Sequence, residues 1–494
     1  MGIVAKQTIK GSLYSYIGIL IGGINIALLY PRIFAEEQVG LINVLLAISS
    51  LAAPFASLGI NGSTNYFFAW FKDKDKKHNG FFLFMLLVSL VGFLLFTIIY
   101  YFFSDTILAT KVEKSELITN HSFYIIPLTL FTLAFSVMDV YSSVLHDSVL
   151  GTVLQEFLFR IINSALIIFY FFHWISFDGF LFWYTVAMAL PPLAIGVILM
   201  KRGEIFWNLP KGALLKRHRK QIFYVSLFYV VSGFGSLMVT YIDRYMVNYF
   251  IGLRAAGIYA ITNYFGSIVE VPRRSMSKIS TPLIADAWKK NDRLVLQSFY
   301  MKSSLTQVLF GLLIFIGIWV NVDSIFVILP KNYQDGREVI FWTGLSVIFN
   351  CFFGVGAQIL LTSTKYKAYT FLTLFLGILV IGTNLLFIPW LGITGAAIAS
   401  AISKFIFSAL VIWVLKYNFN IQPFTKDLLY VVLASIVAYY LGYFVPSTSH
   451  LILNIVIKSL VVAVSYLSIL YFLGVFKEYE EFFNQFATSV WKKD

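Results

Sequence analysis

Residues 80–103 read GFFLFMLLVSLVGFLLFTIIYYFF, a run without a single charged side chain. A helix needs about 20 apolar residues to cross a membrane, because each residue adds about 1.5 Å and the hydrocarbon core is about 30 Å thick. This run is therefore expected to be a transmembrane helix. Runs of the same kind recur along the whole chain, and they predict an all-α protein that crosses the membrane many times.

The composition excludes a soluble globular protein. Of the 494 residues, 59% are hydrophobic and 12% are charged, and the mean hydropathy is +0.81. A single cysteine, Cys351, excludes an internal disulfide, and the six histidines lack the spacing of a metal site. No G-x-x-x-x-G-K loop is present to bind nucleotide phosphates. We expect no metal and no cofactor. Transport against a concentration gradient would therefore need a gradient of H⁺ or Na⁺, or a partner protein.

Apolar runs bounded by charged residues or by Pro, Gly and Asn predict about 14 transmembrane helices. At about 20 residues per crossing, this number leaves little chain for domains outside the membrane. The predicted spans lie near residues 11–33, 39–65, 80–103, 122–145, 151–173, 179–200, 222–249, 256–281, 301–320, 339–361, 368–390, 394–415, 429–446 and 452–474.

Lysine and arginine are distributed unevenly over the two sides of these spans. With an even number of spans, 27 of the 37 Lys and Arg residues fall on one side, six fall on the other and four lie within spans. Because positively charged loops resist translocation, the rich side is predicted to be cytoplasmic, and both termini with it. The net charge of +13 then reflects topology. Lys72–Lys77 reads as a loop at the inner leaflet, and we exclude nucleic acid as a partner.

The two halves of the chain share an internal repeat. Glu36–Ile42 (EEQVGLI) opens the second span and Leu253–Tyr259 (LRAAGIY) opens the eighth, with their glycines 217 positions apart. Gly179 and Gly395 precede the sixth and twelfth spans and lie 216 positions apart. Six spans in each half give both halves the same orientation, so the repeat is parallel, with a pseudo-twofold axis along the membrane normal.

The repeat predicts two six-helix lobes plus two C-terminal helices. The predicted parts are an N-terminal lobe at 1–200, a cytoplasmic linker at 201–221, a C-terminal lobe at 222–415, two appended spans at 416–474 and a cytoplasmic amphipathic tail at 475–494. A cleft between two such lobes would permit alternating access by rocking.

Several ionisable residues fall well inside the predicted spans. A charge at the centre of a span costs about 2.5–3.5 kcal/mol on insertion scales, so these residues must pair, reach the interface or face water. They are Asp139, Glu156, Arg160, Asp243, Arg244, Glu270, Lys404 and Lys458. They therefore include the candidates for a transport site.

Two of these cations are expected deep in the cleft. Arg160 lies about 14 Å from the start of its span, near the middle of the membrane, and Lys404 lies at a similar depth. Glu156 precedes Arg160 by four residues, the spacing of a salt bridge along one helix face, so a purely structural pair is the alternative. Lys458 lies close to the end of its span, from where it can reach the interface.

A positive region is expected where the eighth span emerges on the cytoplasmic side. Arg273, Arg274 and Lys278 follow Glu270 there and could bind an anionic headgroup, although the general excess of positive charge on the cytoplasmic side of membrane proteins explains them equally well. Arg244 is a further candidate cation.

The in-span acids are candidates for ion coupling or for pairing. Asp243 and Arg244 diverge by about 100° on a helix, so at least one of them needs a partner on another helix. Asp139 could hold a proton or sodium ion, or accept a hydrogen bond from a neighbouring hydroxyl.

Several short motifs, in this order on fourteen predicted helices, carry a family resemblance. They are Lys10-Gly11-Ser12, Gly40-Leu41, Leu58-Gly59, Asp243-Arg244-Tyr245-Met246, Ala256-Gly257-Ile258-Tyr259 and Ile388-Pro389-Trp390-Leu391-Gly392-Ile393-Thr394-Gly395-Ala396-Ala397-Ile398-Ala399. With them, residues from about 5 to 475 resemble the polysaccharide (oligosaccharide-lipid) flippases of the superfamily that also holds multidrug exporters and lipid II flippases. The resemblance implies a multi-pass protein of the bacterial inner membrane that moves undecaprenyl-diphosphate-linked oligosaccharides to the outer leaflet.

This resemblance favours one of three functions. A flippase would serve O-antigen, capsule or exopolysaccharide synthesis, with the polymerase and glycosyltransferases of that pathway as possible partners. The alternative is an ion-coupled exporter of small cationic compounds on the same scaffold, for which acidic cleft residues should dominate. An enzyme is disfavoured, because the longest outer connections, 104–121 and 321–338, are too short for a catalytic domain.

Overall fold

A computed structural model describes Tyr14, Asp147 and residues 17–112, 115–145, 149–209 and 212–476. Every regular element within these residues is a helix, which confirms the predicted all-α fold class. The predicted tail at 475–494 lies outside the described residues from 477 onward.

The chain divides into two compact units. The first comprises the described residues of Met1–Ile261 and Thr373–Ala396, and the second those of Thr262–Leu372 and Ala397–Asp494. These units do not test the predicted boundaries of the two lobes, which stay predictions.

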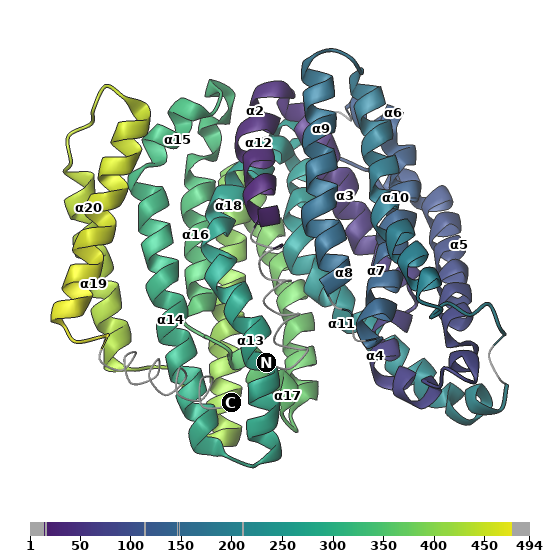
Figure 1. Cartoon of the computed structure of the whole chain (residues 1–494). Helices are drawn as coiled ribbons and strands as arrows, with labels where there is room; N and C mark the ends of the chain where they lie inside the picture. The colour runs from purple at the N-terminus through teal and green to yellow at the C-terminus, as the bar shows by residue number, and fades with distance from the viewer. Residues whose placement is uncertain are drawn as a thin grey trace. The chain divides into compact units, whose positions relative to one another are not determined.

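The first unit holds the following elements, with the last one continuing into the second unit (Figure 1): η1 (Asn25–Leu29), α2 (Tyr30–Ile33), α3 (Glu36–Ala56), α4 (Ile60–Phe71), η2 (Lys77–Gly80), α5 (Phe81–Ile107), α6 (Glu116–His121), η3 (Ser122–Tyr124), α7 (Ile125–Val144), α8 (Val149–Thr152), η4 (Val153–Leu158), α9 (Phe159–Phe171), α10 (Phe177–Lys201), α11 (Gly212–Ile251) and α12 (Leu253–Ser267). The second unit holds η5 (Ile268–Glu270), α13 (Val271–Lys289), α14 (Arg293–Val320), α15 (Val322–Ile328), η6 (Lys331–Gly336), α16 (Arg337–Cys351), α17 (Gly356–Thr362), α19 (Lys426–Tyr443) and α20 (Leu451–Phe472). The remaining element, α18 (Tyr366–Phe419), contributes to both units.

The chain is a polytopic membrane protein. Among the described residues, nine helices are long and apolar enough to cross a membrane, and up to eleven if two bent pairs each count as one span. The predicted spans 368–390 and 394–415 both fall within α18, which is interrupted at Gly392, where φ is +60°. The predicted span 256–281 corresponds to the shorter elements α12, η5 and α13. The count of fourteen therefore stays a prediction.

Aromatic side chains build much of the core of the first unit. Phe67, Phe71, Phe81, Phe82 and Tyr141 are almost completely buried where α4, α5 and α7 pack together. Many of the other side chains on α5 are exposed and apolar, as expected for a helix that faces lipid. Apolar side chains thus fill the interior of the unit and also cover its surface, as expected for a protein surrounded by lipid.

The two motifs of the internal repeat meet each other in the first unit. A Cβ atom on Gly40 would lie 2.0 Å from the carbonyl oxygen of Leu253, and a Cβ atom on Gly257 would lie 2.0 Å from that of Glu36. Glu36 and Leu253 are themselves repeat equivalents, 217 positions apart. The contact between α3 and α12 is therefore reciprocal, as a pseudo-twofold axis through it requires.

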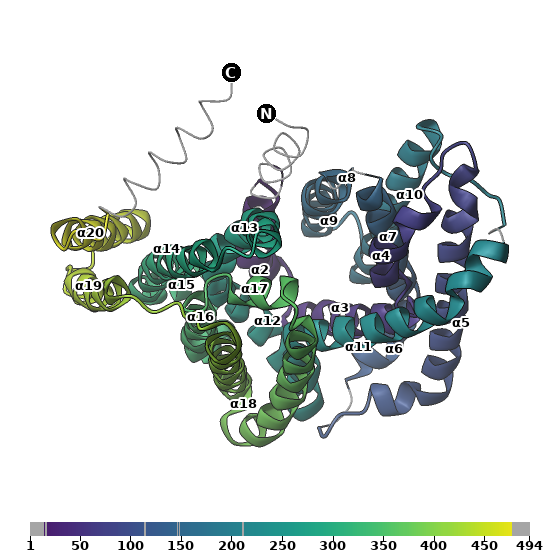
Figure 2. The same cartoon turned by 90° about the horizontal axis from the view of Figure 1, so that it is seen from below.

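In the second unit, the two C-terminal helices pack on α14. Figures 1 and 2 show α19 and α20 side by side, and both contact α14. Tyr466 of α20 is fully buried, and its hydroxyl donates to the carbonyl oxygen of Leu309 at 3.0 Å. These helices thus extend the core of α14 and α16.

Candidate functional site

Arg160 lies in a polar network of the first unit. Its guanidinium donates to Glu156 and, at 2.7 Å, to the carbonyl oxygen of Gly18. The predicted helical salt bridge between Glu156 and Arg160 is therefore formed. Gly22 permits this approach, because a Cβ atom there would lie 2.2 Å from Nη1 of Arg160. The ion pair offsets the Arg160 charge, while 27% of its side chain stays exposed.

Two short π-helical segments frame this network. Glu156 lies in η4, and Asn25 begins η1 on the neighbouring span. The Asn25 amide donates to the Arg160 carbonyl oxygen at 3.3 Å, and Ser164 donates to Asn25 at 2.8 Å. A π turn leaves backbone groups out of the regular ladder and is frequent at functional sites. This part of the unit thus combines irregular backbone with buried polar groups.

Asp243 is the centre of a second buried cluster of the first unit. Its side chain accepts hydrogen bonds from the Tyr259 hydroxyl at 2.9 Å and from the Asn384 amide at 2.7 Å. Asp243 is 6% exposed and Asn384 is fully buried. The expected partner on another helix is thus provided by α12 and α18. A carboxylate held this way within a membrane is a candidate site for H⁺ or Na⁺.

Arg244, the neighbour of Asp243, contacts an aromatic ring. Its guanidinium lies over the Tyr241 ring, 5.6 Å from the centroid, and its Nε atom is buried with no hydrogen-bond partner among the described residues. No ion pair of Arg244 is found in that part of the chain. An aromatic ring compensates a cation only partly, so Arg244 keeps the capacity to bind an anion.

A positive cluster in the second unit surrounds Glu270. Its carboxylate accepts hydrogen bonds from Arg273 and, at 2.9 Å, from Nη2 of Arg274. The arginines lie three and four residues after Glu270, so η5 and the first turn of α13 place all three on one side. Arg273 Nε is also buried without a hydrogen-bond partner among the described residues.

Lys404 adds to this cluster from α18. Its ammonium group lies 3.4 Å from the Ser346 hydroxyl of α16, and it acts electrostatically on Glu270. One carboxylate thus faces three cations, which leaves a net charge of +2. Arginine and lysine form charge-assisted hydrogen bonds with phosphate oxygens, and such bonds strengthen away from bulk water. The arrangement can therefore hold a phosphate-bearing headgroup.

The remaining predicted site residues have contacts of their own or have side chains that are not described. Lys278 belongs to α13, but its side chain lies outside the described part of the chain. Asp139 packs against Gly151, where a Cβ atom would lie 1.8 Å from its carboxylate oxygen. Lys458 reaches the Ser447 hydroxyl at 3.5 Å in an exposed position, in keeping with the expected reach to the interface.

Sequence reasoning missed the neutral partners of the charged residues. Asn384 and Tyr259 bind Asp243, Asn25 and Ser164 surround Arg160, and Ser346 contacts Lys404. The available signal was an asparagine inside an apolar run, because an unsatisfied amide is costly in a membrane. Its partner could not be read from the sequence.

Comparison with known proteins identifies the family of this chain. The pattern of the family described as polysaccharide biosynthesis protein matches residues 5–288. The chain belongs to the polysaccharide biosynthesis protein family. This family member is 25% identical over 312 residues to an uncharacterized membrane protein of Methanocaldococcus jannaschii, a match that covers 59% of this chain and 57% of that protein. The match thus spans less than two thirds of that relative.

Solved structures show the same fold in transporters. The lipid II flippase MurJ, in an inward closed conformation, superposes with a TM-score of 0.76 at 13% identity, covering 95% of this polysaccharide biosynthesis family member and 99% of that chain. An inward-facing multidrug resistance MATE family transporter superposes with a TM-score of 0.58 at 15% identity, covering 83% and 96%. The family member therefore has the fold of these transporters.

Proposed function

We propose that the chain is a flippase that moves polyprenyl-diphosphate-linked oligosaccharides from the inner to the outer leaflet of the bacterial inner membrane by alternating access. The product would feed O-antigen, capsule or exopolysaccharide synthesis, with undecaprenyl diphosphate as the lipid carrier. The polysaccharide biosynthesis family and the fold shared with a lipid II flippase support this proposal.

The observation that carries the proposal is the positive cluster around Glu270. Arg273, Arg274 and Lys404 together give the cluster around Glu270 more positive than negative charge. A diphosphate brings negative charge to such a cluster, whereas a cationic drug would be repelled by it. Both termini and the basic loops would then lie on the cytoplasmic side, where the substrate is made.

A coupling ion would act at the buried acids. Asp243 is the first choice, because two neutral donors, Tyr259 and Asn384, hold its carboxylate without an opposite charge from either of them. Asp139, Glu156 and Glu270 remain further candidates. Binding of H⁺ or Na⁺ at such a carboxylate would change its charge and thereby favour one conformation over another.

The proposal is tested with the purified chain in vesicles. A fluorescent polyprenyl-diphosphate oligosaccharide is added to the membrane, and the fraction accessible to an impermeant quencher is followed over time. The wild type should exchange the lipid between leaflets. Arg274→Glu should slow this exchange by about tenfold or more, since it replaces a charge-assisted hydrogen bond with repulsion.

Lys290→Glu is the matched control for Arg274→Glu. Lys290 caps the end of the same helix, is exposed and lies outside the Glu270 cluster, so this variant should exchange lipid like the wild type. A wild type that leaves the lipid in its original leaflet, yet accumulates a small cationic drug along an ion gradient, would replace the flippase by the exporter alternative.

A further inference from the structure

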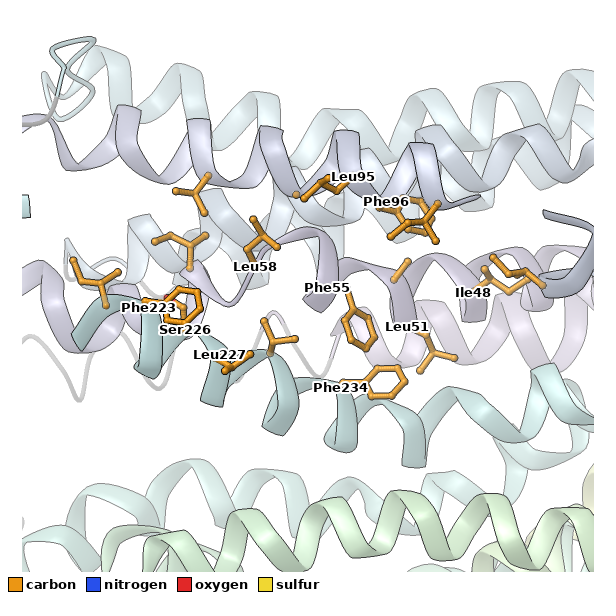
Figure 3. Close-up of a pocket in the computed structure, with 18 of the residues that line it drawn as sticks. Ile48, Leu51, Phe55, Leu58, Leu95, Phe96, Phe223, Ser226, Leu227 and Phe234 are labelled. Atoms are coloured by element: carbon orange, nitrogen blue, oxygen red, sulfur yellow. The ribbon is translucent and has the colours of Figure 1, made fainter. Parts of the chain in front are cut away.

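A long apolar groove lies within the first unit. It has a volume of about 910 Å³ and is lined by side chains of α3, α5 and α11. Figure 3 shows Leu51 and Phe55 of α3, and Leu58 of the turn that follows α3, between side chains of α5 and α11. The volume is near the upper end of the range of about 300–1,000 Å³ that is common for ligand pockets.

Close backbone contacts between the helices set the floor of this groove. A Cβ atom on Gly92 of α5 would lie 2.2 Å from the carbonyl oxygen of Ala56, and one on Gly59 would lie 1.9 Å from that of Ser226 in α11. Phe55 and Phe234 then meet across α3 and α11, with ring centroids 4.4 Å apart. The glycines thus bring α5 and α11 against α3, and larger side chains on either side of these contacts form the walls.

The groove has one polar group that the protein leaves available. The Ser226 hydroxyl donates to Ser63 at 3.0 Å, and the Tyr245 hydroxyl donates to the carbonyl oxygen of Ile107 at 2.9 Å. Arg219 also lines the groove and is exposed, and it has no hydrogen bond or ion pair within the described part of the chain. A ligand that fits should therefore be a long hydrocarbon with an anionic end.

Arg219 lies at one end of the groove. The loop before α11 lies against the beginning of α5, because a Cβ atom on Gly80 would lie 2.5 Å from the carbonyl oxygen of Asn208. The other ends meet where Tyr245 bonds to Ile107. The two walls thus run in the same direction, with Arg219 at the end that the distribution of positive charge predicts to be cytoplasmic.

The length of the groove favours a chain longer than a phospholipid acyl chain. Lining residues on α5 extend from Phe84 to Ile107, which corresponds to about 35 Å at 1.5 Å per residue. One leaflet contributes only about 15 Å of hydrocarbon, half of a core about 30 Å thick. A phospholipid anchored at Arg219 would therefore fill less than half of the groove, whereas a long isoprenoid could continue along it.

We propose that this groove binds the isoprenoid chain of a polyprenyl diphosphate, with Arg219 contacting the diphosphate in a binding step separate from the one at the Glu270 cluster. The inference rests on the proposed function and deepens it, because it assigns the lipid part of the substrate a protein site on α3, α5 and α11. The oligosaccharide does not take part in this binding. A polyprenyl diphosphate without sugar is therefore a sufficient probe.

Photo-crosslinking with matched variants tests the hydrocarbon part of the site. The full chain in lipid nanodiscs is labelled with a polyprenyl diphosphate that carries a diazirine on its chain, and the labelled peptides are mapped by mass spectrometry. Leu95 lines the groove and is 48% exposed, while its neighbour Leu94 is 52% exposed and does not line it. Leu95→Trp should lower labelling of α3 and α11 several-fold, and Leu94→Trp should not.

A second pair of variants tests the headgroup contact. Arg219→Ala should weaken binding of the same probe by about tenfold, since a charge-assisted contact is lost. Lys220→Ala removes the same charge from the next residue, which is exposed but does not line the groove, and should bind like the wild type. Unchanged labelling in Leu95→Trp, equal effects of the two alanine variants, or equal labelling by a diazirine phospholipid would overturn the proposal.

Failure of this inference is separable from failure of the proposed function. If the wild type exchanges the fluorescent oligosaccharide lipid in vesicles and Leu95→Trp changes neither labelling nor exchange, the groove assignment is wrong and the flippase stands. If the wild type exchanges no such lipid, the flippase proposal fails whatever the crosslinking result.

Discussion

Arg160 is a partly exposed cation with a structural ion pair, and its role in substrate binding stays a prediction. It pairs with Glu156 one helical turn away and also donates to the Gly18 carbonyl oxygen. The pair satisfies much of its hydrogen-bonding capacity, yet part of the side chain stays exposed. Stability and transport must therefore be measured separately at this position.

Exchanging the two charges separates these roles. Arg160→Glu places two carboxylates four residues apart, so we expect lower thermal stability and no lipid exchange. The double variant Glu156→Arg with Arg160→Glu restores the ion pair and should recover the melting temperature, but exchange should stay lost because the cation has moved. Exchange that returns together with stability would show that Arg160 serves only the ion pair.

At the residue scale, the sequence showed which charged residues lie inside the predicted spans. It did not show which residues on other helices they contact. The spacing of Glu156 and Arg160 predicted their salt bridge, because both lie on one helix. The bond between Asp243 and Asn384 joins residues 141 positions apart. Such a contact depends on how distant helices pack, and a single sequence does not contain that information.

Among the elements, α3 and α12 form a close and reciprocal contact between the two copies of the repeat. Gly40→Ala should destabilise the protein by about 1–3 kcal/mol, because the added carbon collides with backbone that cannot rotate away. Gly257→Ala should do the same. Gly196→Ala in α10 is the control, since nothing lies within 4 Å of its Cβ position. Melting temperatures in detergent measure all three, and equal values would contradict the close contact.

The connection between α4 and α5 is held by a pH-sensitive ion pair. Glu204 binds Lys74 at 2.7 Å and His78 at 3.0 Å. Lys77, His78 and Asn79 all have positive φ, which is unfavourable for residues with side chains. Burial acts to raise the pKa of Glu204, but the hydrogen bonds from His78 and Lys74 outweigh it and lower that pKa below its ordinary value.

Because folding lowers the pKa of Glu204, its ionised form stabilises the fold. This contribution is present above the ordinary carboxylate pKa of 4.5 and is lost as pH falls through the lowered value. The wild type should therefore melt at a higher temperature than Glu204→Gln at pH 7, and the difference should shrink as the pH falls below about 4.5. A difference that does not shrink even when the pH is well below 4.5 would contradict the ionic contribution.

Helix positions were predictable where the apolar run was long and uninterrupted. The run at 80–103 lies within the single helix α5, and the runs at 429–446 and 452–474 correspond to α19 and α20. Prediction was poorer around 256–281, where polar and charged residues become frequent and the structure has a 3-10 turn between α12 and α13. Hydrophobicity alone does not determine how such a mixed segment packs.

For the whole molecule, the distribution of positive charge predicts the orientation in the membrane. Single cysteines introduced into a Cys351→Ala background can be labelled with an impermeant maleimide, since the native cysteine is buried. Lys331→Cys should be labelled in intact cells, and Lys74→Cys, on a side chain that is 59% exposed, only after the cells are opened. The reverse pattern would invert the topology.

The reciprocal glycine contact also limits how the two halves of the gene can diverge. Each copy's glycine faces the backbone of the other copy at a distance that leaves no room for a methyl group. The two copies of an internal repeat can differ at most positions, because equivalent residues in the two copies contact different residues. Here a larger residue in one half would collide with the backbone of the other, so we expect glycine to be required at both positions.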